Sequence, residues 1–312
     1  MAAPLNICVL GGTGFVGTAL INRLTQQGHW VSVPTRDPEL NQRLRVLPTV
    51  RLVRANVHDA RVLDRLVDGM DAVVNLVGVL NERGRSTFQH VHVDLAAKLV
   101  AALKAGRVRR LLHMSALGAD VRGPSRYLRS KGEAETLVRA AGAHADFTLF
   151  RPSVIFGPGD SLTNRFAGLL RLSHGWLPLA RAHAHFAPVY VGDVAEAFVH
   201  ALSDRETFGQ TYELGGPQIM TLEQIVRTTA SVAALPCRIL RLPDALGRLQ
   251  GAVMGFLPGK PFTLDNFRSL TRDSVCTEDG FARLGLRRHG MMEILPTYLA
   301  PQAAPAAFAA HA

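Results

Sequence analysis

The sequence predicts an α/β protein with a Rossmann-type, doubly wound parallel sheet and a smaller C-terminal lobe. Apolar runs alternate with helical patterns through the first half of the chain, an order typical of parallel sheets. The first apolar run also ends in a glycine-rich turn that leads directly into a helical pattern. Hydrophobic residues make up 47% of the 312 residues, which is enough for a buried core and excludes a disordered chain.

The alternation suggests a division into three parts. We expect a dinucleotide-binding core over residues 1–155, because the regular alternation fades beyond it. A mixed substrate or partner lobe would follow over 156–300, with a strand near 185–191 returning to the core. The Ala/Pro-rich tail over 301–312 is typical of a disordered segment.

The first strand and turn carry the strongest motif. Residues 7–10 predict a buried strand, and the glycines after it fit both G-x-G-x-x-G and G-x-x-G-x-x-G. Such glycines let backbone N–H groups approach a pyrophosphate at the start of a helix. The residues we expect at this phosphate site are Gly11, Thr13, Gly14, Phe15, Val16 and Gly17.

The second strand is predicted over residues 30–36. A carboxylate at this strand end would bind the 2′-hydroxyl of NAD, whereas an arginine accommodates the 2′-phosphate of NADP. The chain has Arg36 here and no acid before Asp37. The sequence therefore favours NADP(H) over NAD(H).

Three further strands are predicted over residues 50–57, 71–78 and 109–115, with a long amphipathic helix over 88–105. Ligands of doubly wound sheets lie at the carboxyl ends of the strands. The residues that fall at those ends are Gly11, Arg36, Asn56, Asn75 and Ser115.

The next helix carries Tyr127 and Lys131 four residues apart, and therefore on one face. A nearby ammonium lowers the pKa of a phenol, so the pair could donate or accept a proton.

The second half of the chain has weaker signals. After a sixth strand over 147–153, a short strand is expected over 183–191, followed by a helix that Asp193 caps. A helix with an N-cap pattern begins near Thr221. Three histidines, at 174, 183 and 185, have no cysteine or carboxylate at ligand spacing, so we expect no metal site.

Residues 242–258 are apolar, rich in glycine and weakly basic. They suit an interfacial helix, a lid over a lipophilic substrate, or a core helix of the small lobe. The net charge of +10 fits either an arginine-rich surface or attraction to an anionic membrane or acidic partner. Scattered basic residues argue against nucleic-acid binding. Without a signal peptide or spanning segment, we expect a cytoplasmic protein or one peripheral at the inner face of the membrane.

These motifs together resemble the short-chain dehydrogenase/reductase superfamily, and its atypical-extended, NAD-dependent epimerase/dehydratase-like branch in particular. Within it, the segments 127–131 and 188–194 are similar to the NADPH-binding accessory subunits of respiratory complex I and their bacterial relatives. The short gap from Ser115 to Tyr127 departs from the extended sugar-nucleotide epimerases and argues against that activity.

The resemblance implies roles for matching residues. Gly11, Gly14 and Gly17 would contact the pyrophosphate, and Arg36 the 2′-phosphate. The adenine would lie beside Asn56 and Val57, although many relatives have Asp at position 56. The residues implied around the nicotinamide and its ribose are Asn75, Val77, Gly78, Tyr127, Lys131, Pro152 and Ser153, with Ser115 polarising a substrate carbonyl.

Three functions follow as hypotheses. The first is an NADP(H)-binding protein associated with the respiratory chain or quinone metabolism, in which the nucleotide is either structural or used. The second is a freestanding NADPH-dependent reductase of a lipophilic carbonyl or quinone. The third is a regulator that senses NADP(H) without turnover, which the Tyr127–Lys131 pair disfavours.

Overall fold

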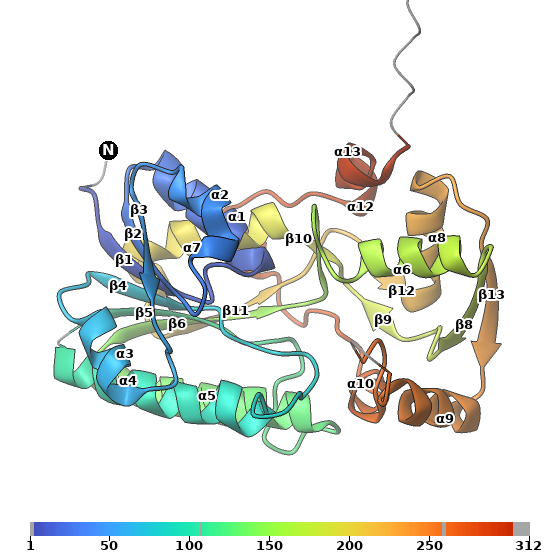
Figure 1. The fold of residues 1–312 in the computed structure, drawn as a ribbon, viewed down its shortest axis with the longest axis horizontal. Helices are drawn as coiled ribbons and strands as arrows, with labels where there is room; N and C mark the ends of the chain where they lie inside the picture. The colour runs from blue at the N-terminus through green and yellow to red at the C-terminus, as the bar shows by residue number, and fades with distance from the viewer. Residues whose placement is uncertain (1–2, 107, 258–259, 302–312) are drawn as a thin grey trace, which may run out of the picture.

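A seven-stranded parallel sheet organises the larger lobe (Figure 1). The structure is a computed structural model that describes residues 3–106, 108–257 and 260–301. The strands of the sheet, in spatial order, are β11 (Gln210–Leu214), β6 (Asp146–Pro152), β5 (Arg110–Met114), β4 (Ala72–Asn75), β1 (Asn6–Leu10), β2 (Trp30–Thr35) and β3 (Val50–Arg54). The order reverses next to β1, so the predicted doubly wound sheet is confirmed.

Helices cover both faces of this sheet (Figure 1). One face carries α1 (Phe15–Gln26) and α7 (Val191–Ser203), which pack on each other, with the short α2 (Gln42–Arg45) nearby. The other face carries α3 (Ala60–Val67), α4 (Leu95–Gly106) and α5 (Arg126–Ala140). The strands are therefore buried on both sides, which explains their nearly continuous apolar runs.

The long helix expected over 88–105 is not one regular α-helix. Its first part, η2 (Gln89–Asp94), has π-helical hydrogen bonding and runs directly into α4. A π-helical turn widens the backbone and changes the direction of its side chains, which hydrophobic periodicity does not reveal.

The smaller lobe contains α6 (Thr163–Leu172) and α8 (Leu222–Val232), which share an apolar core with three two-stranded sheets. Those sheets pair β7 (Ile155–Phe156) with β10 (Val189–Tyr190), β9 (His185–Phe186) with β12 (Met220–Thr221), and β8 (Trp176–Ala180) with β13 (Arg238–Leu242). The C-terminal part of the chain adds five helices, α9 (Asp244–Met254), α10 (Leu264–Ser269), α11 (Gly280–Arg283), α12 (Met291–Ile294) and α13 (Pro296–Leu299).

Three 3₁₀ turns lie between elements of the larger lobe: η1 (Glu39–Asn41), η3 (Ala141–Ala143) and η4 (Arg205–Thr207).

Two predictions in this lobe are wrong in detail. The single strand expected over 183–191 is divided into β9 and β10, which pair with different partners, because Pro188 between them has no N–H to continue a ladder. Asp193 does not cap α7, since the helix already begins at Val191. The Asp193 carboxylate is buried and accepts hydrogen bonds from the backbone N–H of His289 at 2.7 Å and from its ring Nδ1 at 2.6 Å.

Three further predictions concern the second half of the chain. The helix start at Thr221 is confirmed as a capping box with Gln224. The apolar stretch over 242–258 contains α9, and the predicted disordered tail lies outside the described residues from 302 onward. Among the residues described, no helix combines the length and apolar character needed to span a bilayer.

Candidate functional site

The glycine-rich turn brings β1 and α1 into close contact. Gly11 has φ +78°, a conformation that favours glycine, and a Cβ atom on Gly17 would lie 2.5 Å from the Gly11 carbonyl oxygen. Gly14 is the exposed N-cap of α1 and provides no side-chain cap for the first-turn N–H groups. A helix start of this kind attracts phosphate oxygens.

A group of basic residues lies near the ends of β2 and β3. Arg36 is exposed directly after β2. The rings of His58 and His90 stack with centroids 4.2 Å apart, and Lys98 Nζ donates a 2.7 Å hydrogen bond to the His58 carbonyl oxygen. Burial lowers the pKa of His58, and the cations around it, Arg36 and Lys98 among them, lower it further. Asn56 is exposed, and its Oδ1 accepts a hydrogen bond from the His58 N–H.

The turn after β4 is shaped by its own polar side chain. Asn75 is buried, and its Oδ1 accepts a 3.2 Å hydrogen bond from the Val77 N–H while its Nδ2 lies 3.1 Å from His113 Nδ1. A Cβ atom on Gly78 would lie 3.3 Å from Lys131 Nζ. The Asn75 side chain therefore holds the turn and is not free for a ligand, whereas Gly78 keeps the space beside Lys131 open.

The end of β5 carries polar atoms without protein partners. Ser115 is buried, and its Oγ has no hydrogen-bond partner in the described part of the chain. His113 Nε2 is also buried without a hydrogen-bond partner among the described residues. Burial lowers the pKa of this histidine to about 3, so its ring is neutral at neutral pH. Buried polar atoms are normally paired, so an unpaired hydroxyl indicates a place where a ligand atom completes the bonding.

Helix α5 brings Tyr127 and Lys131 to this strand end. The side chain of Ser125 caps the helix, and Asp265 accepts the Tyr127 N–H at 3.0 Å. Lys131 Nζ donates a 3.1 Å hydrogen bond to the carbonyl oxygen of Met114, the residue before Ser115. The side chain of Lys131 therefore links α5 to the strand end that carries the unpaired hydroxyl.

The protonation of this pair differs from our expectation. Burial raises the pKa of Tyr127 to about 12, so the predicted lowering by the ammonium of Lys131 is wrong for this structure. Burial also lowers the pKa of Lys131 to about 8, against an opposing effect of Glu135. At neutral pH Tyr127 is consequently a phenol and Lys131 is mostly an ammonium.

The sequence interpretation missed His92, which lies in η2. Its Nε2 accepts a 3.1 Å hydrogen bond from the Val79 N–H, and its Nδ1 lies 2.8 Å from Ser130 Oγ. Its ring also meets the ring of Tyr127 edge-on, with centroids 5.7 Å apart. Apolar periodicity predicted only a helix here, and no spacing pattern separates His92 from its neighbour His90.

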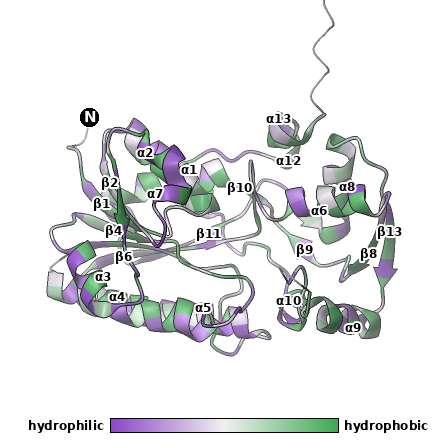
Figure 2. Cartoon of the chain, viewed as in Figure 1, coloured by the Kyte–Doolittle hydropathy of each residue, from purple (hydrophilic) through white to green (hydrophobic). Residues whose placement is uncertain are grey.

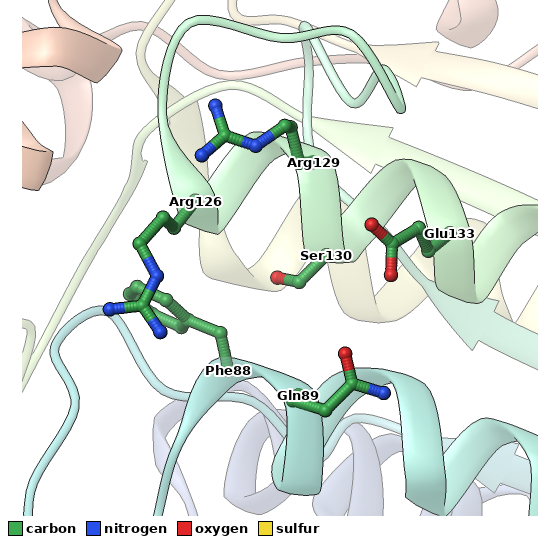
Figure 3. Close-up of a pocket in the computed structure, with 6 residues that line it drawn as sticks. All are labelled: Phe88, Gln89, Arg126, Arg129, Ser130 and Glu133. Carbon is green, nitrogen blue, oxygen red and sulfur yellow. The ribbon is translucent and has the colours of Figure 1, made fainter.

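A pocket opens between η2 and α5 (Figure 3). Figure 3 shows Ser130 directed from α5 toward η2, and the Arg126 side chain beside Phe88. The six residues that line the pocket are Phe88, Gln89, Arg126, Arg129, Ser130 and Glu133. The pocket thus borders α5, the helix that carries Tyr127.

The turn after β6 is tied to the smaller lobe. Pro152 is buried, and Ser153 Oγ donates to the Ser274 carbonyl oxygen at 2.7 Å and accepts the Ala187 N–H at 3.1 Å. The side chain of Ser153 is therefore occupied by protein contacts, and only the backbone of this turn remains for a ligand.

The predicted residues divide into two groups. One gathers where β4, β5, η2 and α5 meet and contains Gly78, Ser115, Tyr127 and Lys131. The other follows the ends of β1, β2 and β3. Its members are Gly11, Gly14, Gly17 and Arg36, with Thr13, Phe15 and Val57 partly buried and Val16 buried. Such an arrangement can hold an extended, phosphate-bearing ligand along the sheet edge, with its far end beside Tyr127.

The chain is similar in sequence to a known family and to several known proteins. The family model described as NAD dependent epimerase/dehydratase family matches residues 7–215. The chain is 32% identical over 287 residues to the NADH dehydrogenase [ubiquinone] 1 alpha subcomplex subunit 9 of Arabidopsis thaliana, covering 87% of this chain and 71% of that protein. It is 30% identical over 310 residues to the ceramide reductase of Caulobacter vibrioides, covering 96% of this chain and 87% of that protein.

Solved structures share the fold. A dTDP-glucose 4,6-dehydratase from Streptomyces venezuelae superposes with a TM-score of 0.73 over 94% of this chain and 95% of that one, at 20% identity. At this level of identity the likeness concerns the fold alone.

Proposed function

Since the chain belongs to the NAD dependent epimerase/dehydratase family, we propose that it binds NADP(H) and uses it to reduce a lipophilic carbonyl compound. The observation that carries the proposal is the buried Ser115 hydroxyl, which has no partner among the described residues and lies at a strand end linked to Lys131. In this proposal a substrate oxygen completes the bonding of this hydroxyl.

The glycine turn fits the phosphates of the nucleotide. Gly17 allows strand and helix to approach so closely that any side chain there would clash with Gly11 and Gly12, and the first turn of α1 has no side-chain cap. Arg36 makes no ion pair within the described ranges and would be available to a 2′-phosphate. These features support NADP(H) as the preferred cofactor.

The reduced nucleotide would supply a hydride to the carbonyl carbon. Ser115 Oγ would donate a hydrogen bond to the substrate oxygen and stabilise its developing negative charge. Tyr127 would then give its proton to that oxygen, producing an alcohol. A tyrosine whose pKa is about 12 holds a proton at neutral pH, which suits the direction of reduction. The ammonium of Lys131 would stabilise the phenolate that remains.

The choice of a lipophilic carbonyl rests on one relative. The ceramide reductase of Caulobacter vibrioides matches nearly the whole of this chain, and its name describes an enzyme that acts on a lipid. The match covers 87% of the ceramide reductase, compared with 71% of the plant subunit. We therefore favour a freestanding reductase of a lipid-like carbonyl or a quinone.

A second candidate is a role in the respiratory chain, with the nucleotide structural. The likeness to complex I subunits from plants, fungi and animals favours it. The chain spans 71% of the plant subunit and 57% of the fungal one, so any shared assembly remains part of this proposal. In that case Tyr127 would hold the nicotinamide ribose without transferring a proton.

One experiment separates the two. Purified protein is analysed by mass spectrometry for co-purified nucleotide and lipid, and NADPH consumption is then measured with a panel of lipid ketones and quinones. The reductase proposal expects turnover that Tyr127→Phe reduces by about a hundredfold or more, whereas Tyr212→Phe, on the edge strand β11, leaves it unchanged. Bound NADPH that no compound in the panel consumes would overturn it in favour of the structural role.

A further inference from the structure

Helix α9 contacts the rest of the protein through glycines. A Cβ atom on Gly247 would lie 2.8 Å from the Phe267 ring and 3.0 Å from Ala180, and one on Gly251 would lie 3.0 Å from the Thr263 backbone. These two residues are the buried ones of the helix, and they are four positions apart on one face. The helix therefore packs closely at the two positions where it has no side chain.

The opposite face of α9 presents its large apolar side chains to solvent. Leu249 and Val253 are 58% and 57% exposed, and Leu246 precedes them at helical spacing. Phe256, just after the helix, is 92% exposed, and Leu257 is also exposed. Figure 2 shows how much of α9 is hydrophobic. An amphipathic helix normally turns such a stripe toward the core, so this one indicates a binding surface.

The charges around α9 indicate which kind of partner would bind this surface. Residues 236–272 contain six Lys or Arg residues and two Asp residues, a net charge of +4. Two of the six basic residues pair with acids elsewhere in the chain, Arg241 with Glu223 and Arg272 with Asp120, which leaves four. Arg248 makes no ion pair within the part of the chain that the structure describes, while the acidic Asp244 is neutralised by Arg181 at 2.6 Å. Two copies of this face would repel each other, whereas an anionic bilayer would attract it.

The same segment leads to the candidate site. Lys260 Nζ donates a 2.6 Å hydrogen bond to the Glu82 carbonyl oxygen, and Asn81 Nδ2 donates to the Lys260 carbonyl oxygen at 3.1 Å. In α10, which lies beside α9 in Figure 1, Asp265 accepts the Tyr127 N–H. Since the glycine face of α9 meets α10, the exposed apolar stripe points away from α10 and Tyr127, and α10 connects the two.

From these observations we infer that α9 is a membrane-docking helix. Leu246, Leu249, Val253 and Phe256 insert among the acyl chains of an anionic bilayer, and Arg248 pairs with lipid headgroups. The inference goes beyond the proposed function, because docking does not require catalysis.

The test uses the full chain and vesicles of phosphatidylcholine with or without phosphatidylglycerol, at low ionic strength. The wild type is expected to sediment with the mixed vesicles, to a much smaller extent with pure phosphatidylcholine, and to dissociate as salt is added. Leu249→Glu combined with Val253→Glu should reduce the bound fraction by about tenfold or more. The matched control combines Leu40→Glu with Val46→Glu, residues that are 81% and 80% exposed on the large lobe, and it should bind like the wild type.

Four results bear on the inference independently of the enzyme. In Phe256→Trp, fluorescence quenched by brominated acyl chains would support insertion. Equal binding of the α9 variant and the control, or no binding of the wild type to anionic vesicles, would overturn the inference. So would concentration-dependent dimers that the α9 variant abolishes, since these would assign the face to a second copy. NADPH binding, measured in parallel, tests the proposed function separately.

Discussion

His92 Nδ1 lies 2.8 Å from Ser130 Oγ, and the hydroxyl of Ser130 in turn donates to the Tyr127 carbonyl oxygen at 2.8 Å. Because His92 Nε2 accepts the Val79 N–H, the neutral ring carries its proton on Nδ1 and donates it to Ser130. Burial lowers the pKa of His92 to about 2, so the ring is neutral at neutral pH. One imidazole thus fixes the turn after β4 relative to the Tyr127 helix.

The first prediction concerns this bridge. His92→Ala leaves the Val79 N–H and Ser130 Oγ without their partner, so we expect the free energy of unfolding to fall by about 1–3 kcal/mol. NADPH binding should weaken as well, because the Gly78 turn loses its support. Denaturant unfolding and calorimetry measure both effects. His144→Ala, at an exposed site, is the control, and an equal effect of the two variants would contradict the prediction.

The second prediction concerns the glycine turn. Gly17→Ala places a methyl group 2.5 Å from Gly11 and Gly12, and should lower the free energy of unfolding by about 1–3 kcal/mol. It should also weaken nucleotide binding at least tenfold. Gly168→Ala in α6 has open space around it and should stabilise the protein by about 0.5–1 kcal/mol. Thermal melts with and without NADPH distinguish the two, and unchanged binding by Gly17→Ala would refute the phosphate site.

The third prediction concerns Lys131. Burial lowers its pKa from 10.5 to about 8, which corresponds to about 3 kcal/mol. Because the unfolded chain binds this proton more tightly, stability should rise with pH from about 8 toward 10.5. The pKa of Tyr127 rises from 10 to about 12 on folding, so this group lowers the stability with increasing pH, but only above pH 10.

The measurement compares wild type with Lys131→Met by denaturant unfolding across pH 7 to 10. The variant should be more stable than the wild type at pH 7, and the difference should shrink as pH increases. A difference that stays constant over this range would show that the ammonium is not desolvated in the folded protein.

The fourth prediction concerns cofactor preference. Arg36→Asp should reduce the ratio of NADPH to NADH affinity by at least about tenfold, since a hydrogen bond to a charged group contributes about 1.5–3 kcal/mol. Arg51→Asp, an equal change of charge on the exposed side of β3, should leave the ratio intact. Competitive titration of both nucleotides gives the ratio, and parallel behaviour of the two variants would mean that Arg36 does not face the 2′-phosphate.

Much of the larger lobe could be predicted from the sequence, because its elements are determined locally. Buried parallel strands appear as continuous apolar runs, and the glycine turn after β1 has a fixed spacing. Cys8, within the strand predicted over residues 7–10, is buried, and burial raises the pKa of its thiol to about 12.

The rest depends on contacts between residues far apart in the chain. Asp193 suits an N-cap by local preference, but its partner His289 is 96 positions away. The bonding of Asn75 and Ser153, which occupies both side chains, could not be seen from spacing either. The outward face of α9 follows from close packing by Gly247 and Gly251, whereas hydrophobic periodicity alone also suits a core helix.

Calorimetric titration of the purified chain with NADPH tests the central claim most directly, after any co-purified nucleotide has been removed. The proposed nucleotide site at the glycine turn, Arg36, Tyr127 and Lys131 predicts saturable binding of one nucleotide per chain, weakened by Gly17→Ala. Absence of binding for both NADPH and NADH, in protein that unfolds cooperatively, would contradict it.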